Sequence, residues 1–475
     1  MTSQSNNSTE LAVVGGGPGG YPAAFLAADL GMQVTLIDLE PRPGGVCLYR
    51  GCIPSKALLH VAKLLTEARE AAALGIEFSE PKIDMDRLRA WKESVVQQLT
   101  RGLSQLSRQR KITYVQGRAT FLDARNLNIQ RTDGKEDALT FEHAIVATGS
   151  RPATIPALSL DSDRVMDSTT ALELNDIPET LLVIGGGYIG LELGTVYAAL
   201  GSQVSVVEML PSLLPGADKD LVRVLAKRVG TLFHSVMLNT TVAEMQVVEG
   251  GIKVRFDGDT DEPEQIFEKI LVSVGRKPNS SGFGLDSTEV AIDQQGFIKV
   301  DEQRRTAEPT IYAIGDVAGE PMLAHKATHE GRMAVEAIAG HKVAFEPQAI
   351  PAVVFTDPEV AWCGLTETQA KEQGRLIKVA RFPWGASGRA TTLSRNNGLT
   401  KLIIDPETAR VLGVGIVGTG AGELIAEGVL AVEMAALASD VQLSIHPHPT
   451  LSETLMEAAE VFFGHSTHVY RPQRG

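Results

Sequence analysis

Two cysteines near the N-terminus have the residue types and the spacing for thiol–disulfide chemistry. Cys47 and Cys52 lie in GGVCLYRGCIPSK with four residues between them, and Pro54 fits the opening of a helix. A thiolate near a helix N-terminus is stabilised, and a disulfide there could exchange with a dithiol substrate. The alternative is a pair of buried structural cysteines. Zinc is not expected, because the spacing is not C-x-x-C and no second cysteine pair exists to complete four ligands, and we predict no metal site.

A histidine and a glutamate near the C-terminus could move protons. In SIHPHPTLSE, His448 stands five residues before Glu453, across an expected loop-to-helix junction where Ser452 could cap the helix. Histidine exchanges protons near neutral pH, and a carboxylate can fix its tautomer and stabilise its cation. A chance surface pairing is the alternative, and we expect a structural role for the neighbouring His446.

An internal repeat indicates the elements that must position these groups. Residues 11–38 and 181–208 each contain an apolar strand, the pattern G-x-G-x-x-G, a helix-length run and a second strand that ends in an acid. This is the βαβ dinucleotide-binding pattern. Its glycines allow a tight turn, close approach to a pyrophosphate and close helix packing, and its acid can accept a hydrogen bond from a ribose hydroxyl. The residues are Gly15, Gly17, Gly20 and Asp38, then Gly185, Gly187, Gly190 and Glu208.

Two complete copies of the pattern suggest two dinucleotide cofactors, with electrons passing between them. A single match could be a glycine-rich turn, but strand, glycines, helix, strand and acid occur here twice in order. Glu208 would repel a 2′-phosphate, and Met209, Leu210 and Pro211 supply no cation to bind one. NAD is therefore favoured over NADP, unless Glu208 is merely an acid at the end of a strand.

These motifs and their order resemble the pyridine nucleotide–disulfide oxidoreductases, and among them the dihydrolipoamide dehydrogenases, over essentially the whole chain after the first ten residues. The resemblance implies an α/β fold with two Rossmann-like dinucleotide-binding domains, one for FAD and one for NAD, and a C-terminal α+β dimerisation domain. The implied FAD domain comprises residues 1–150 and 276–345. The implied NAD domain is 151–275 and the interface domain is 346–475.

The resemblance also assigns roles to single residues. Cys47 becomes the interchange thiol that attacks the lipoyl disulfide, and Cys52 the flavin-side thiolate. His448 becomes the base that deprotonates the substrate dithiol, oriented by Glu453. Asp316 alone could equally be a helix cap or a turn acid. The further positions implied to contact a cofactor are Lys56, Gly117, Thr148, Gly149, Ser150, Asp316, Met322, Leu323, Ala324 and His325 for FAD, and Glu192 and Gly275 for NAD.

Three residues depart from the usual pattern of that family. Tyr49 and Arg50, between the cysteines, are bulkier than the family's residues and bear on access to Cys47. Pro447 stands where the family usually has alanine.

The implied activity is FAD-dependent oxidation of protein-bound dihydrolipoamide to lipoamide, with reduction of NAD⁺ to NADH through a Cys47–Cys52 redox disulfide. The chain would serve 2-oxo acid dehydrogenase complexes or the glycine cleavage system. Its implied partners are a second copy of itself, in a homodimer whose His–Glu pairs reach the other subunit's active site, and a lipoyl-bearing acyltransferase or lipoyl carrier protein.

Other functions fit the residues less well. Glutathione reductase is disfavoured by Glu208, mercuric reductase by the lack of a C-terminal cysteine pair, and a soluble transhydrogenase by the presence of Cys47 and Cys52. A flavoprotein kept only as a docking subunit is the non-enzyme alternative. The presence of both cysteines, His448 and Glu453 argues against it.

Length and composition agree with an intracellular enzyme. The 475 residues suggest about three domains. A net charge of −14 disfavours binding to nucleic acid, and no charge-free apolar stretch is long enough to cross a membrane. The N-terminal MTSQSNNSTE does not resemble a signal peptide. With three cysteines in all, we expect a reducing cytoplasm, and we expect the unpaired Cys363 to be a small core residue.

Overall fold

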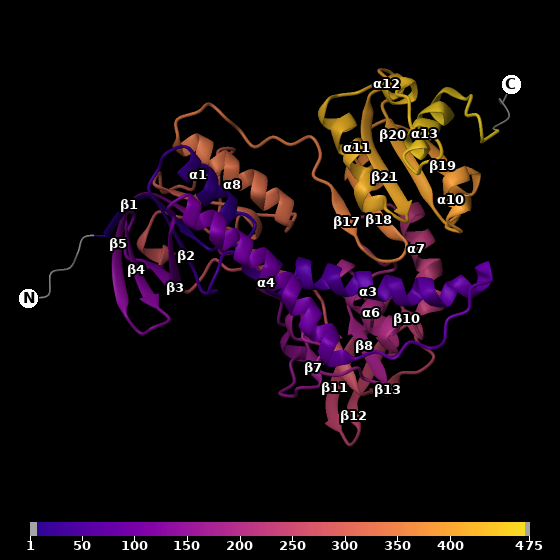
Figure 1. Cartoon of the computed structure of the whole chain (residues 1–475), viewed down its shortest axis with the longest axis horizontal. Helices are drawn as coiled ribbons and strands as arrows, with labels where there is room; N and C mark the ends of the chain where they lie inside the picture. The colour runs from indigo at the N-terminus through magenta and orange to yellow at the C-terminus, as the bar shows by residue number, and fades with distance from the viewer. Residues whose placement is uncertain (1–6, 471–475) are drawn as a thin grey trace, which may run out of the picture. The chain divides into compact units, whose positions relative to one another are not determined.

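The computed structural model describes residues 7–470, which form two compact units. The first comprises the chain up to Ala57, Lys82–Ala153 and Gly275–Glu346. The second comprises Leu58–Pro81, Thr154–Val274 and the chain from Pro347 onward. The boundary near residue 57 falls inside α3 (Cys52–Glu70). Each unit is described by itself, and Figure 1 labels the elements.

The first unit is built on a mainly parallel sheet. Its parallel strands lie in the order β3-β2-β1-β5-β16, and β4 pairs antiparallel with both β3 and β5. A short ribbon of β6 and β15 lies outside it. The strands are β1 (Asn7–Val14), β2 (Val34–Asp38), β3 (Thr113–Phe121), β4 (Asn126–Arg131), β5 (Glu136–Val146), β6 (Ser150–Pro152), β15 (Arg276–Pro278) and β16 (Ile311–Ala313).

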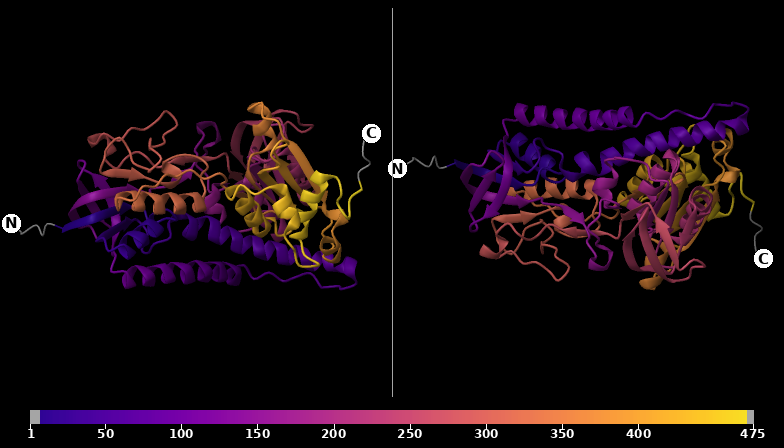
Figure 2. Two further views of the ribbon diagram at one scale, coloured as in Figure 1. Left: turned by 90° about the horizontal axis from the view of Figure 1, so that it is seen from above. Right: turned by 90° about the horizontal axis from the view of Figure 1, so that it is seen from below.

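Both faces of this sheet are buried, which explains why its strands are apolar without alternation. Leu11 and Val13 of β1 pack with the alanine-rich sides of α1 and α8. Ala12 and Val14 point to the other face and pack with side chains of β3, β4 and β5. The helices of this unit are α1 (Gly20–Asp29), α2 (Gly45–Arg50), the start of α3, α4 (Met85–Gln109), which can be followed along its length in Figure 2, and α8 (Ala324–Ile338).

The second unit contains another parallel sheet, in the order β10-β9-β8-β14-β7, and a three-stranded antiparallel sheet, β11-β12-β13. Their shared core includes Leu182, Ile184 and Phe256. The strands are β7 (Val165–Met166), β8 (Thr180–Ile184), β9 (Gln203–Val207), β10 (Ser235–Met237), β11 (Thr240–Val248), β12 (Gly251–Gly258), β13 (Glu264–Phe267) and β14 (Lys269–Val272). The helices are α5 (Ser168–Ala171), α6 (Tyr188–Leu200) and α7 (Lys219–Leu232).

The C-terminal part of the second unit is a five-stranded antiparallel sheet, β17-β18-β21-β20-β19. Side chains of α11 and α13 complete a core that contains Trp384, Ile416 and Cys363. The elements are β17 (Ala352–Val354), β18 (Glu359–Gly364), α9 (Glu367–Glu372), β19 (Lys378–Pro383), α10 (Gly388–Thr392), β20 (Leu399–Ile404), β21 (Val411–Gly418), α11 (Ala421–Glu433), α12 (Ala438–Leu443) and α13 (Glu453–Phe463). The expected fold class is confirmed: two parallel α/β sheets and a C-terminal α+β region.

A buried ion cluster joins the two parts of the second unit. The ammonium of Lys401, 1% exposed, lies 2.6 Å from Asp218 Oδ2 and 2.7 Å from both Asp220 Oδ1 and Glu367 Oε1. Arg381 Nε contacts Asp220 Oδ2 at 2.7 Å. These three carboxylates lie close enough together to hold a metal ion. Two side-chain cations of the chain itself already neutralise them.

No helix among residues 7–470 is long and apolar enough to cross a membrane.

Candidate active site

The first glycine loop leaves a backbone surface open beside the N-terminus of α1. Gly15 has a φ of 109°, a conformation that favours glycine. A side chain on Gly20 would collide with the Gly15 carbonyl, whereas a side chain on Gly17 would meet nothing nearer than the Gly45 Cα at 3.9 Å. The N-cap residue is Gly19, so no side chain occupies the N-terminus of this helix as a cap. The free N–H groups of this helix end therefore suit a pyrophosphate.

The second glycine loop repeats this geometry. Gly185 has a φ of 107°. Gly187 is the N-cap of α6, has no capping side chain, and has no atom within 4 Å of the place where a Cβ would stand. A Cβ on Gly190 would collide with the Gly185 carbonyl and lie 2.6 Å from Ser273 Oγ. Both loops thus fit a dinucleotide.

The two predicted acids are held in the same way. Asp38 accepts hydrogen bonds from the backbone N–H groups of Gly16 and, at 2.8 Å, of Glu40. Glu208 accepts them from Gly186 at 2.7 Å and Leu210 at 2.8 Å. Each carboxylate is therefore fixed at the edge of its glycine loop, with lone pairs left for a ribose hydroxyl.

The helix that carries Cys47 lies directly on the first glycine loop. The Gly44 amide donates to the Gly16 carbonyl at 2.8 Å, and a Cβ on Gly45 would lie 2.5 Å from the Gly17 Cα. Only glycine permits this backbone contact. Both glycines stand in the motif GGVCLYRGCIPSK, but the motif alone did not predict this contact.

The two thiols lie side by side at the junction of α2 and α3. Cys47 is partly buried, and the exposed Cys52 is the first residue of α3. A Cβ on Gly51 would lie 3.2 Å from the Cys47 Cα, so glycine lets the two cysteines approach. The hydrogen bond to Cys52, together with burial, raises the pKa of Cys47, against the opposing charge of Lys56. In the dithiol, Cys47 therefore holds its proton more tightly than an ordinary cysteine does.

The loop at residues 148–150 is tied to two distant segments of the first unit. Thr148 Oγ1 donates to the Asn279 carbonyl at 2.7 Å. Ser150 Oγ donates to Asp316 Oδ2 at 2.5 Å and accepts from Arg276 Nε at 2.7 Å. The predicted Ser150 and Asp316 are thus brought together. Arg276 and Asn279 were not predicted, although they lie with the predicted Gly275 in the segment VGRKPN at residues 274–279.

A buried glutamate supports the turn that carries Asp316. Glu330, on α8, accepts a hydrogen bond from the Gly315 amide at 2.6 Å. Its other oxygen lies 3.0 Å from both Arg304 Nη1 and Lys326 Nζ, and its side chain is fully buried. The sequence reading did not single out this network.

Replacing Glu330 with glutamine is expected to lower the free energy of unfolding by about 3 kcal/mol, because it leaves two buried cations without their carboxylate. Urea unfolding monitored by circular dichroism would measure this change. Arg332→Ala, at an exposed position on the same helix, should change stability by no more than about 0.5 kcal/mol. A Glu330→Gln loss no larger than that of the control would contradict the prediction.

Other residues predicted to contact a cofactor lie in a strand, at the start of a helix and in two loops. Gly117 of β3 is opposite Arg131, and a Cβ there would lie 2.7 Å from the Gln130 carbonyl, so strand pairing alone requires this glycine. The predicted stretch at residues 322–325 contains the N-cap and first two residues of α8. Gly149 and Gly275 both have positive φ, at 67° and 115°.

Glu192 on α6 is directed toward the C-terminal part of its unit. It is 3% exposed, and its carboxylate accepts a hydrogen bond from the Phe355 amide at 2.9 Å. Sequence reasoning placed Glu192 at the NAD site but did not foresee this contact.

The structure brings His448 and Glu453 together in the second unit. His448 Nδ1 donates to Glu453 Oε1 at 2.9 Å, and the Thr450 amide donates to Glu453 Oε2 at 2.7 Å. Partial burial raises the pKa of Glu453, but the Thr450 amide and His448 outweigh it and hold that pKa below its ordinary value. With Nδ1 carrying a hydrogen, Nε2 of the exposed imidazole is left to accept a proton.

The expected helix cap at this junction is wrong. Ser452 occupies the N-cap position of α13, but its side chain makes no capping hydrogen bond. Its hydroxyl instead pairs with Thr450 Oγ1 at 2.9 Å. His446 lies 2.8 Å from both Glu427 Oε1 and the Ser444 carbonyl, as expected of a structural residue.

Cys363 is a core residue, as expected. It is 1% exposed on β18, and burial raises its pKa to about 12.

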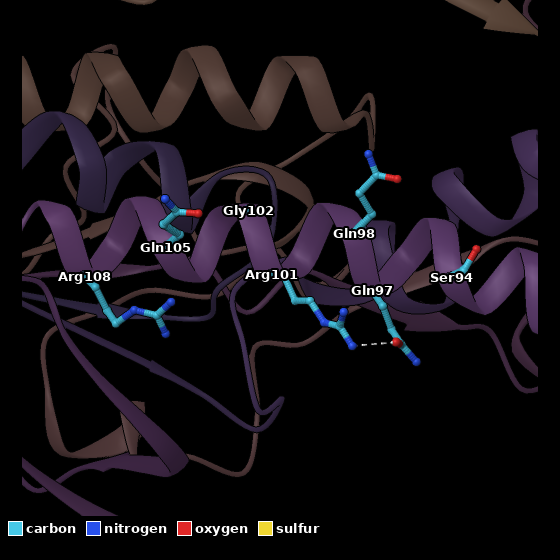
Figure 3. A pocket seen from close by; sticks show the side chains of 7 residues that line it. All are labelled: Ser94, Gln97, Gln98, Arg101, Gly102, Gln105 and Arg108. Atoms are coloured by element: carbon cyan, nitrogen blue, oxygen red, sulfur yellow. Dashed lines mark hydrogen bonds between the residues drawn. The ribbon is translucent and has the colours of Figure 1, made fainter.

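A shallow hollow on α4 contains none of the predicted site residues. It is lined by polar side chains that include Ser94, Gln98, Gln105 and Arg108, and Arg101 donates to Gln97 Oε1 at 3.1 Å (Figure 3). Apart from Gly102, the residues that line it have polar side chains, and none of them is an acid or a cysteine.

Comparison with known proteins identifies the family. A family model described as "Pyridine nucleotide-disulphide oxidoreductase" matches residues 9–331, and the dimerisation-domain model of that family matches residues 350–459. The chain belongs to the pyridine nucleotide-disulphide oxidoreductases.

Several curated relatives of this oxidoreductase carry one name. "Dihydrolipoyl dehydrogenase" from Haemophilus influenzae is 49% identical over 97% of this chain and 96% of its own length. The protein of that name from Vibrio parahaemolyticus is 48% identical over 96% of each chain, and that from Geobacillus stearothermophilus is 42% identical over 97% of each.

Solved structures resemble this oxidoreductase over nearly its whole length. LpdA from Mycobacterium tuberculosis matches with a TM-score of 0.89 and 28% identity, over 96% of this chain and 99% of that one. The HOCl-induced flavoprotein disulfide reductase RclA from Escherichia coli matches, in a Cu(II) complex, with a TM-score of 0.86 and 26% identity, over 96% and 99%.

Proposed function

We propose that this oxidoreductase oxidises protein-bound dihydrolipoamide to lipoamide and reduces NAD⁺ to NADH. The observation that carries the proposal is the hydrogen-bonded Cys47–Cys52 pair seated on a dinucleotide loop. Relatives named dihydrolipoyl dehydrogenase, up to 49% identical over nearly full length, support the choice of a dithiol substrate.

FAD and NAD are the cofactors. We assign FAD to the domain formed by residues 1–150 and 276–345, and NAD to residues 151–275. The first glycine loop, Asp38, the 148–150 loop and Asp316 would hold FAD, together with Lys56 and residues 322–325. The second loop, Glu192, Glu208 and Gly275 would hold NAD. When bound, FAD would supply the two-electron chemistry that links the thiols to NAD⁺.

The cysteines carry the first half-reaction. A substrate thiolate attacks the Cys47 sulfur of the disulfide, and Cys52 leaves as a thiolate at the N-terminus of α3. The second substrate thiolate then displaces Cys47 and closes the lipoyl disulfide. The substrate has lost two electrons and two protons, and the protein holds a Cys47 thiol and a Cys52 thiolate. The raised pKa of Cys47 supports its role as the sulfur that ends the half-reaction as a thiol.

His448 accepts a substrate proton in this scheme. Its Nε2 is the available nitrogen, since Nδ1 faces Glu453, and the ionised Glu453 stabilises the imidazolium. We assign this pair to the active site of the second subunit of a homodimer.

A match to the dimerisation-domain model supports the homodimer. The same region presents large apolar side chains to the surface, as an interface between copies would require. These are Leu430, Met434, Leu443 and Ile445, which are 62%, 72%, 77% and 99% exposed. The second partner is a lipoyl-bearing acyltransferase or lipoyl carrier protein, which supplies the substrate.

The direct test is NADH formation by the purified protein supplied with FAD, dihydrolipoamide and NAD⁺. Rapid NADH production supports the proposal. A flavin-loaded protein with a reducible cysteine pair but no turnover of dihydrolipoamide would redirect the search to another disulfide.

NAD⁺ is expected to exceed NADP⁺ in kcat/KM by at least about 100-fold, because the buried Glu208 carboxylate would repel a 2′-phosphate. Glu208→Gln removes the charge and should reduce this ratio about tenfold. Glu244→Gln, an exposed acid of the same unit, is the control and should leave the ratio unchanged. An unchanged ratio in Glu208→Gln would mean that specificity lies elsewhere.

A further inference from the structure

The two unusual residues between the cysteines contact the loop that follows β2. The Arg50 guanidinium forms an ion pair with the Glu40 carboxylate. Tyr49 Oη donates to the Arg42 carbonyl at 3.2 Å, and the Tyr49 side chain also hydrogen-bonds Thr100. Both side chains are therefore engaged on the side of α2 that meets residues 40–42.

The same loop is held from β3. Tyr114 Oη donates to the Glu40 carbonyl at 2.7 Å, and Gln116 Nε2 donates to the Leu39 carbonyl at 3.1 Å. The Glu40 amide in turn donates to Asp38 Oδ1 at 2.8 Å. The acid at the end of β2 thus belongs to a loop braced by two elements.

The positive charge of Arg50, on α2, affects the pKa of the Asp38 carboxyl. Burial raises the pKa of Asp38, and the Gly16 amide and the positive charge of Arg50 oppose this rise. The cation that acts on the Cys47 thiol is Lys56. Arg50 thus favours the ionised Asp38, which is the better acceptor for a ribose hydroxyl.

We propose that Tyr49 and Arg50 are positioning residues for FAD: they brace the 38–42 loop so that Asp38 holds the adenosine ribose, and they set how long FAD stays bound. This inference rests on the FAD site proposed above. From the sequence we expected Tyr49 and Arg50 to affect substrate access to Cys47, whereas this inference gives them a role in retaining FAD. It also means that one six-residue helix, α2, carries both a redox thiol and contacts that retain the cofactor.

The test is the rate of FAD release from the holoprotein, followed as recovery of free-flavin fluorescence after dilution. Arg50→Ala should release FAD about fivefold faster, the ratio expected for loss of one half-exposed ion pair. Arg50→Lys keeps the charge and should stay within about twofold of wild type. Tyr49→Phe should have a smaller effect of about twofold, because one hydrogen bond at 3.2 Å is lost.

Matched variants separate this role from general destabilisation. Arg131 pairs with Asp137 at 3.1 Å in the same unit, and its side chain is 40% exposed against 41% for Arg50. Arg131→Ala should therefore leave FAD release unchanged. Glu40→Gln should match Arg50→Ala, and the double variant should release FAD no faster than either single variant, since both remove one interaction.

Two outcomes would overturn the inference, and a third result would concern the proposed function instead. FAD release from Arg50→Ala at the wild-type rate, with a severalfold change in KM for dihydrolipoamide, would return these residues to substrate access. Additive effects of Glu40→Gln and Arg50→Ala would show that the pair does not act as a brace. A wild-type protein that binds no FAD would instead refute the proposed function.

Discussion

Cys47→Ser is expected to reduce dihydrolipoamide oxidation by at least about 10⁴-fold while the protein keeps its FAD. A serine hydroxyl at this position cannot form the mixed disulfide, and the remaining thiol cannot close an internal disulfide. Steady-state NADH formation measures the loss. The visible flavin absorbance of the purified variant reports the retained cofactor, since the Gly44 and Gly45 contacts that seat α2 do not involve the sulfur.

The third cysteine provides the matched control. Cys363→Ala removes a thiol from the core of the C-terminal region and should leave kcat within about twofold. Comparable losses in Cys47→Ser and Cys363→Ala would show that thiol loss acts through folding. Substantial turnover by Cys47→Ser would remove this cysteine from the mechanism.

His448→Gln is expected to lower kcat by about 10³-fold, within the range for loss of a general base. Glutamine can still donate to Glu453 but cannot accept the substrate proton. Glu453→Gln should cost less, about tenfold to 100-fold, because it loosens the imidazole and removes the charge that stabilises its cation. Stopped-flow reduction of the enzyme by dihydrolipoamide would locate the loss in the first half-reaction.

A second histidine–glutamate pair, whose glutamate also lies on α13, serves as the control. His468 Nδ1 contacts Glu457 Oε1, and the His468 side chain is 56% exposed. His468→Gln should change kcat by less than about twofold. Equal losses in the two histidine variants would mean that the helix, rather than the His448 base, had been disturbed.

The sequence predicted the local geometry of groups whose members lie close together along the chain. The glycines and the acid of each βαβ unit lie within about 25 residues of one another, and backbone geometry constrains each of them. The same holds for His448 and Glu453, five residues apart. Short uninterrupted apolar runs likewise predicted strands of both parallel sheets, because these strands are buried on both faces.

Contacts between distant segments could not be predicted in this way. Ser150 meets both Arg276 and Asp316, and Glu330 meets Arg304, through pairings that exist only once the sheet has formed. Charged residues are common in any sequence, so an isolated arginine or glutamate carries no signal of burial. The error at Ser452 has a local cause: its backbone is already helical, with φ −65° and ψ −26°, whereas a capping side chain needs an extended N-cap.

The Lys401 ion cluster connects the segment matched by the dimerisation-domain model to residues 218–220, which precede that segment. The family model for that region begins at residue 350, but two carboxylates around the Lys401 ammonium come from the start of α7, far outside it. A fragment cut at this boundary would hold a buried lysine without two of its three counter-charges, and its neighbour would hold two acids without their cation. We therefore expect the matched segment to be less stable alone than it is in the whole chain. Transplanting it between relatives would require moving Asp218 and Asp220 along with it.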